Sequence, residues 1–284
     1  DPAANTSEFS ARRQPCVATV GGLVSWWPAE GTASDISGTN HGTLQNGVTF
    51  ATGTVGQAFS FNGNSYAQSP STGLPTGSSD RTIEMWVYVN SFFPGEAYFA
   101  GYGNFGVTNQ SYHMGTLGST LYITTWGTAI LGPALSSGTW HHVAATNVGN
   151  FFTLYLNGAP VASATLPVST PSGTPFDIGR IPGSLGDSRK LNGLVDEVTV
   201  YNRALAAAEI QAIYNAGSAG KCPCSYQLSP ASAFFGVDGS ESSFTITATP
   251  GCNWSAESNG NWITLSSETS GAGTSVVSYI VRDN

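Results

Sequence analysis

Short runs of alternating, β-branched and aromatic residues limit most strongly how this chain can fold. Gly, Asn, Pro or Ser residues bound each run, and the clearest runs are LVSWW (23–27), AFSF (58–61), RTIEMWVYV (81–89), TLYITTW (120–126), WHHVAAT (140–146), FFTLYLN (151–157) and LVDEVTVY (194–201). Asn157-Gly158 between two such runs is a strong hairpin signal. Strands in close succession without helices between them predict an antiparallel sandwich and not an alternating β-α sheet.

The composition excludes several other classes of protein. Charged residues make up 9% of the 284 residues, against about 25% in an average globular protein, so helical bundles and coiled coils are unlikely candidates for this chain. Hydrophobic residues reach 40%, which excludes a disordered chain. A net charge of −8 argues against a nucleic-acid partner. No apolar run is long enough for membrane insertion, and the polar tract 1–15 is interpreted as a disordered or vector-derived tail.

One helix and a second unit are expected after the first sandwich. The alanine-rich segment 203–217 places Leu205, Ile210 and Ile213 near one face and ends at Gly217, as a helix would. We therefore expect a first domain at 16–217, a linker at 218–222 and a smaller β-rich unit at 223–284.

Four cysteines in a chain with few charges favour disulfides and an oxidising compartment. Zinc is the rival interpretation, but the C-P-C spacing does not suit it. Cys222 and Cys224 flank one proline, so each is expected to bond a distant partner. We predict Cys16–Cys222, which closes the first domain, and Cys224–Cys252, which closes the second.

The order of several segments resembles a known family. LVSWWPAEGTASDISGTNHGTL, QAFSFNGNSYAQSP, TIEMWVYV, GTWHHVAAT, FTLYLNGAPVASA and LNGLVDEVTVYNRALAAAEIQAIYNAG stand in the order found in laminin-G-like jelly rolls of the concanavalin A-like lectin/glucanase superfamily. The segment from Cys224 onward resembles a BACON-type module, a small immunoglobulin-like sandwich, which here is expected to be incomplete. The resemblance implies an all-β protein with one short helix after the jelly roll.

The resemblance also implies one structural Ca²⁺ ion. Carried over by position, its ligands would be the carboxylates of Asp35 and Asp196, with Asn40 and Glu30 as further candidates. The alternative is that Asp35 organises a turn and that Asp196 is a hydrogen-bonded residue at a strand end.

The carboxylates do not form the pattern that a glycoside hydrolase needs. Retaining enzymes need two carboxylates about 5–5.5 Å apart, and two carboxylates at alternate positions of a strand would share one face. Glu84 stands alone, Asp196 and Glu197 are adjacent, and His141-His142 suits structural packing. The sequence therefore predicts a protein without catalytic residues.

A carbohydrate ligand fits the sequence better. Sugars need aromatic faces for stacking and polar side chains for their hydroxyls, and the segment around 101–115 is rich in both. The predicted ligand-binding residues are Tyr102, Asn104, Tyr112, His113, Trp126 and Arg180. The alternative, that the aromatic residues fill the core, stays open.

These observations predict a secreted or cell-surface, non-catalytic protein that binds a glycan or serves adhesion. A structural spacer or protein-interaction module is the second hypothesis, and a glucanase or lyase is the third.

Overall fold

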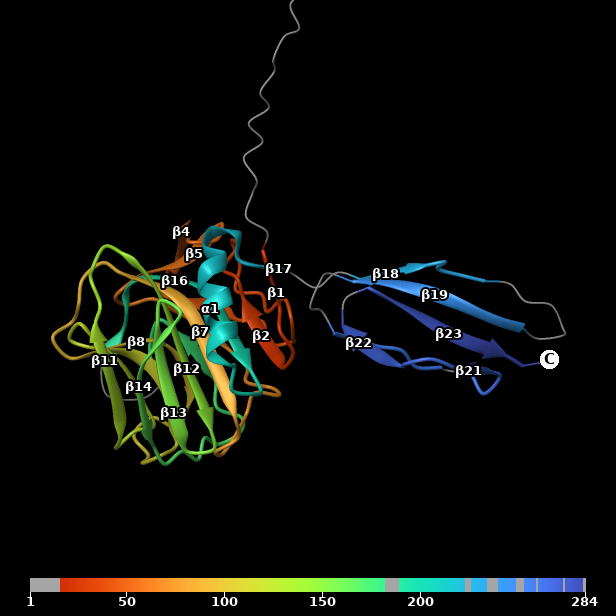
Figure 1. Ribbon diagram of the computed structural model, residues 1–284. Coiled ribbons are helices and arrows are strands. Elements are labelled where there is room, and N and C mark those ends of the chain that lie inside the picture. The colour runs from red at the N-terminus through yellow and green to blue at the C-terminus, as the bar shows by residue number, and fades with distance from the viewer. Residues whose placement is uncertain are drawn as a thin grey trace, which may run out of the picture.

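The structure is a computed structural model that describes residues 16–181, 189–222, 226–233, 240–248, 253–258, 260–272 and 274–282. Figure 1 shows one β-sandwich with a helix against it, and the later strands grouped as a second unit. No helix in the described stretches is long and apolar enough to span a membrane.

Two antiparallel sheets form the sandwich. The seven-stranded sheet has the order β11 (Ala129–Ala134), β10 (Thr120–Thr124), β9 (Ser111–Leu117), β8 (Glu96–Gly103), β15 (Phe176–Ile178), β6 (Tyr66–Ser69) and β3 (Thr43–Gln45). The eight-stranded sheet has the order β14 (Ala159–Thr165), β13 (Phe151–Leu156), β12 (Trp140–Val148), β7 (Arg81–Val89), β16 (Asn192–Tyr201), β5 (Gln57–Asn62) and β4 (Thr49–Thr52), with β2 (Leu23–Trp27) paired to β16. The predicted all-β jelly-roll sandwich is confirmed.

The core lies between the two sheets and follows from the alternation of each strand, because every second side chain points inward. Trp27 of the eight-stranded sheet stacks on Phe176 of the seven-stranded sheet, with ring centroids 4.7 Å apart. Tyr112 and Phe152 meet across the same interface at 5.4 Å. Asn157 and Gly158 have φ of +51° and +80°, as the turn of the predicted hairpin requires.

The outer face of the eight-stranded sheet is covered by α1 (Ala207–Ala216), as Figure 1 shows. Ile210 and Ile213 pack with Leu205 and Tyr201 in a second apolar cluster, so the predicted helix face is confirmed. At the start of the helix, Glu209 accepts hydrogen bonds from the backbone of Ala206 and from Arg203.

The two ends of the sandwich are tied together. β1 (Val17–Ala18) pairs in parallel with β17 (Lys221–Cys222), after the short 3₁₀ turn η2 (Gly217–Ala219). The predicted Cys16–Cys222 disulfide is confirmed, with the two Cα atoms 5.1 Å apart. The segment expected as a linker, 218–222, thus ends in two buried residues of this sandwich. Cys224 and Cys252 lie outside the described residues.

The second unit contains two small sheets. The first has the order β18 (Tyr226–Ser229), β19 (Ser240–Ala248), β23 (Ser275–Val281) and β21 (Ile263–Leu265), and the second pairs β20 (Asn253–Ser255) with β22 (Ser270–Ala272). Trp254 packs with Ile246 and Val277, but Trp262, just before edge strand β21, is 53% exposed. The domain boundary, the immunoglobulin-like class and the incompleteness of this unit stay predictions.

Candidate functional site

A row of polar residues crosses the outer face of the seven-stranded sheet. Side chains of directly paired residues lie on the same face of a sheet, and the pairing register aligns Thr124, His113, Gly101, Asp177, Gln68 and Thr43. Gly101 stands in this row because a Cβ atom there would collide with the Tyr112 carbonyl oxygen and would lie 2.6 Å from both Cα and ring Cδ2 of His113. The sequence therefore folds into a sheet with an apolar inner face and a polar strip outside.

Asp177 is the centre of the row. Its Oδ1 accepts hydrogen bonds from Gln68 Nε2 at 3.1 Å and from Arg180 Nε at 2.8 Å. Its Oδ2 is buried and has no hydrogen-bond partner within the described part of the chain; we call such a buried polar atom an orphan atom. Burial raises the pKa of Asp177 although Arg180 and Gln68 oppose the shift.

Arg180 connects this carboxylate to an aromatic ring. Its guanidinium carbon lies 3.3 Å from the centroid of the Tyr66 ring, and its side chain keeps 20% of its surface exposed. A partly exposed aromatic ring beside a buried carboxylate and an arginine can contact both the apolar and the polar parts of one ligand.

His113 is held neutral in the same face. Its Nδ1 shares a hydrogen bond of 2.6 Å with the Ser111 hydroxyl, and its Nε2 is an orphan atom with respect to the described residues. Burial lowers the pKa of His113 to about 3.

An aromatic group borders the polar row. Trp126 and Phe105, both partly buried, lie 4.0 Å apart between ring centroids. Arg189 lies 5.0 Å from the Phe105 ring and forms an ion pair of 3.1 Å with Glu96. Trp126 has a φ of +66°, which is uncommon for a residue with a side chain.

The structure corrects part of the predicted ligand site. Tyr102 and Tyr112 are completely buried on the inner face, where the Arg81 guanidinium lies 5.6 and 5.0 Å from their rings. Their proposed role in stacking on a sugar is wrong, because strand alternation turns these two paired residues into the core while His113, the next residue after Tyr112, points outward.

The other predicted residues lie on or near the outer face. Arg180 belongs to the polar row and Trp126 to its aromatic border, whereas Asn104 is exposed and donates a hydrogen bond to Gln110. Sequence analysis missed Tyr66, Gln68 and Asp177. The alternation in YAQS and FDI, two short runs with polar residues between apolar ones, was the available signal.

The four predicted metal ligands fall into two pairs. Asp35 and Asn40 form the first, and the Asp35 carboxylate accepts backbone hydrogen bonds from Trp26, Ser37, Gly38 and Asn40. The Asn40 side chain is in turn bonded to Ser25 and Thr72. Because backbone N–H groups donate to its carboxylate on several sides, Asp35 organises this loop, as the alternative interpretation expected.

Glu30 and Asp196 both contact the turn 53–57, Glu30 at Gly56 and Asp196 at Gly53. Glu30 accepts a hydrogen bond from Gln57 N and Asp196 Oδ2 accepts one from Val55 N. A Cβ atom on Gly53 would lie 2.5 Å from Asp196 Oδ2 and 2.8 Å from the Gln57 carbonyl oxygen, so acidic and carbonyl oxygens meet there.

The charge of this second pair is not balanced. Asp196 Oδ1 is an orphan atom in the described structure, and burial together with Glu197 raises the pKa of Asp196 to about 8. Such a set of oxygens suits Ca²⁺. Across the described residues, no three His, Cys, Asp or Glu side chains gather as a metal cluster, so backbone carbonyls would have to complete the coordination.

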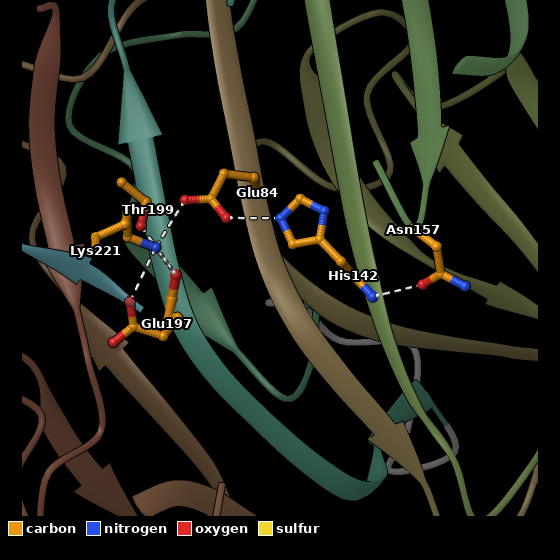
Figure 2. Close-up of polar contacts among 6 residues, drawn as sticks. All are labelled: Glu84, His142, Asn157, Glu197, Thr199 and Lys221. Carbon is orange, nitrogen blue, oxygen red and sulfur yellow. Dashed lines mark hydrogen bonds and ion pairs between the residues drawn. The ribbon is translucent and has the colours of Figure 1, made fainter. Parts of the chain in front are cut away.

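A buried ion cluster lies on the opposite sheet, between the outer face of that sheet and β17 (Figure 2). Lys221 Nζ lies 2.9 Å from Glu84 Oε1 and 3.1 Å from Glu197 Oε2, and Glu84 Oε2 lies 3.1 Å from His142 Nε2. Burial alone would raise the pKa of Glu84, but Lys221 and His142 outweigh it and lower the pKa to about 2.

This cluster is structural. Glu84, Glu197 and Lys221 are each at most 5% exposed, so a substrate cannot reach the two carboxylates. The bulge of β16 at 196–199 places both adjacent carboxylates between the core residues Val195 and Val198, and they have different partners: Asp196 accepts from Val55 N, whereas Glu197 pairs with Lys221.

The two-sheet fold is that of the concanavalin A-like sandwiches. The family described as "Concanavalin A-like lectin/glucanases superfamily" (Laminin_G_3) matches residues 61–211. The chain belongs to this family, and no curated protein matches it.

Several solved structures share the fold. Domain 4 of AbnA, an extracellular arabinanase of Geobacillus stearothermophilus solved with arabinotriose, is 20% identical over 66% of this chain and 96% of that domain, with a TM-score of 0.55. The binding domain of Paraclostridial Mosquitocidal Protein 1 is 20% identical over 69% of this chain and 52% of that chain, with a TM-score of 0.57. Trypanosoma rangeli sialidase is 19% identical, and the match covers 71% of this chain but 34% of the sialidase, with a TM-score of 0.58. At these identities the likeness concerns the fold.

Proposed function

We propose that the chain is a non-catalytic glycan-binding protein whose ligand contacts the outer face of the seven-stranded sheet. The observation that carries this proposal is the partly exposed Arg180 side chain, which lies on the partly exposed Tyr66 ring and is held there by the fully buried carboxylate of Asp177. A sugar offers hydroxyl oxygens that accept hydrogen bonds from a guanidinium and C–H surfaces for an aromatic ring.

The comparisons support a sugar ligand without identifying it. The family includes lectins and glucanases, and one structural neighbour was solved with arabinotriose. The Cys16–Cys222 disulfide supports a place outside the cytosol, since such bonds persist in oxidising compartments.

Binding is favoured over hydrolysis by the arrangement of the carboxylates. A glycoside hydrolase uses two carboxyl groups on either side of the scissile bond. On this face Asp177 is held by Arg180 and Glu96 by Arg189. Each carboxylate is thus paired with an arginine. Such pairing suits a binding site better than an active site, in which the two carboxyl groups must act as proton donor and nucleophile.

We also propose that a structural Ca²⁺ ion is held by Asp196 and the Gln57 carbonyl oxygen. The support is the orphan oxygen of Asp196, unpaired among the residues described, and the meeting of carboxylate and carbonyl oxygens at Gly53. The ion would bind the turn 53–57 to β16 and stabilise the sandwich.

A glycan array with the intact chain, followed by calorimetry on the best ligand, tests the function. We expect Asp177→Asn and Arg180→Ala to weaken binding at least tenfold, because each loses a charge-assisted hydrogen bond. Gln211→Ala on α1, on the other sheet, is the control and should bind like the wild type.

Three results would contradict the proposal. An array without any bound glycan would favour the structural spacer. Unchanged affinity in both variants would place the site elsewhere. Release of reducing sugar from the bound glycan would make the protein an enzyme.

A further inference from the structure

A cavity lies on the inner face of the four-stranded sheet in the second unit. Its volume of about 550 Å³ is within the usual range for a small-molecule site. Side chains from all four strands line it: Leu228, Phe244, Leu265 and Tyr279. By strand alternation and pairing register, they lie on the same side of the sheet as the buried core of this unit. The cavity therefore continues the apolar core toward solvent.

Aromatic rings form part of the wall of this cavity. Phe244 and Tyr279 lie 6.0 Å apart between ring centroids. Trp262 also lines the cavity and keeps 53% of its surface exposed. Its indole lies against the backbone of Gly260, since a Cβ atom there would lie 2.6 Å from the indole Nε1. Three aromatic side chains thus border one space, and one of them is open to solvent.

The polar part of the lining consists of one charge and few available hydrogen-bonding groups. Glu257 is the only charged residue among the described lining residues, and its exposed carboxylate has no partner within the described stretches of the chain. The Ser258 hydroxyl is already within hydrogen-bond distance of the carbonyl oxygens of Gly260 and Ile263, at 2.8 and 3.0 Å. A carboxylate accepts hydrogen bonds and does not donate them. This lining suits a cation with apolar substituents better than a sugar, which needs several polar partners.

The charge of the second unit favours the same class of ligand. Residues 223–284 contain one base, Arg282, and five acids, Asp238, Glu241, Glu257, Glu268 and Asp283. The unit therefore carries a formal charge of −4 at pH 7. A surface of this sign attracts cations and repels anions.

We infer that this cavity binds an alkylated ammonium group, with the cation over the Trp262 ring and beside the Glu257 carboxylate. Aromatic faces attract cations, and quaternary ammonium ligands are recognised in this way. The alkyl groups of the ligand contact Phe244 and Leu228, and Glu257 balances the charge. The cavity belongs to the second unit, so this site and the proposed glycan site on the first sandwich are independent.

Titration of the intact chain with choline, followed by NMR of the backbone amide and indole N–H groups, tests the inference. The matched ligand is the neutral carbon analogue of choline, in which a tert-butyl group replaces the trimethylammonium group. The variants are Trp262→Ala, which also assigns the indole resonance, and Glu257→Gln. Glu268→Gln is the matched control, because Glu268 is an exposed acid of the same unit that does not line the cavity.

We expect choline to shift the Trp262 indole resonance and to bind at least fivefold more tightly than its neutral analogue. This factor corresponds to about 1 kcal/mol for a cation over an exposed aromatic ring. Trp262→Ala and Glu257→Gln should each weaken choline binding at least threefold, and Glu268→Gln less than twofold. All three side chains are exposed, so the variants should melt at the temperature of the wild type.

Several results would overturn the inference. Absence of choline binding, or equal affinity for choline and its neutral analogue, would show that the cavity does not select a cation. Equal losses in Glu257→Gln and Glu268→Gln would mean that only the overall charge of the unit matters. A Trp262 resonance that responds to a glycan and not to choline would make the cavity a sugar site. None of these outcomes involves Arg180 or Tyr66, so the proposed function is judged separately.

Discussion

Replacing Lys221 with Met should destabilise the sandwich more than any change of a surface lysine. The ammonium group lies 2.9 Å from a Glu84 oxygen and 3.1 Å from a Glu197 oxygen, and it also lies 5.2 Å from the Trp26 ring. The two carboxylates lose their shared cation in the variant while they remain buried.

The magnitude follows from this geometry. At an effective dielectric constant of about 20, opposite charges some 3–4 Å apart attract by about 4–5 kcal/mol. Breaking a buried ion pair by removing one partner costs about 3–5 kcal/mol. Because one cation serves two carboxylates here, we expect a loss of about 4 kcal/mol in the free energy of unfolding.

Urea unfolding at pH 7, followed by tryptophan fluorescence, measures this loss. Lys190→Met is the matched control, since Lys190 bonds the exposed Asn64 and should cost at most about 1 kcal/mol. Glu84→Gln should cost less in the Lys221→Met background than in the wild type, by about 1–3 kcal/mol. Equal losses in the two methionine variants would refute the reasoning.

Three further predictions concern other parts of the sandwich. The pKa of His113 is about 3 in the fold and 6.5 when unperturbed. As the pH falls the unfolded state therefore takes up a proton first, and the free energy of unfolding should fall below pH 6.5 by up to about 1.4 kcal/mol per pH unit. Urea unfolding at pH 7, 6 and 5 should show a flatter pH dependence for His113→Gln than for the wild type, and an unchanged slope would contradict this. Asp196→Ala should lower the melting temperature about as much as chelator does, with little further effect of chelator on the variant; a wild type without calcium by metal analysis and without a response to chelator would exclude the ion. The double variant Cys16→Ser, Cys222→Ser removes a bond between residues 206 positions apart. Urea unfolding should show a loss of up to about 5 kcal/mol in the free energy of unfolding. No change would show that β1 and β17 hold the two ends together without the bond.

The sequence predicted the sandwich because its strands carry the signal locally. Runs such as RTIEMWVYV alternate, the hairpin turn has Asn157-Gly158, and the helix has Ile210 and Ile213 on one face, so each element could be recognised without its neighbours. The Cys16–Cys222 bond could also be predicted, because the position of each cysteine relative to the domain ends restricted its partner.

The candidate site was harder to predict because it depends on register between distant strands. His113, Gly101, Asp177 and Gln68 come from four strands, and nothing near any of them in the chain shows that they align. Tyr102 and Tyr112 looked like a sugar platform because glycines surround them. In the fold, those glycines make room for outward groups such as the His113 ring, while the tyrosines point inward.

The same two-sidedness distinguishes the outer faces of the two sheets. The eight-stranded sheet is covered on its outer side by α1 and by β17, whose Lys221 completes the buried ion cluster. The outer face of the seven-stranded sheet instead carries Asp177 and His113, each with a polar atom that no described residue satisfies. Leaving such atoms without partners costs about 1–3 kcal/mol each, a cost that the tied and covered sheet can offset. Asp177 and His113 are themselves fully buried, so a ligand at this face would contact the partly exposed Arg180 and Tyr66 that lie beside Asp177.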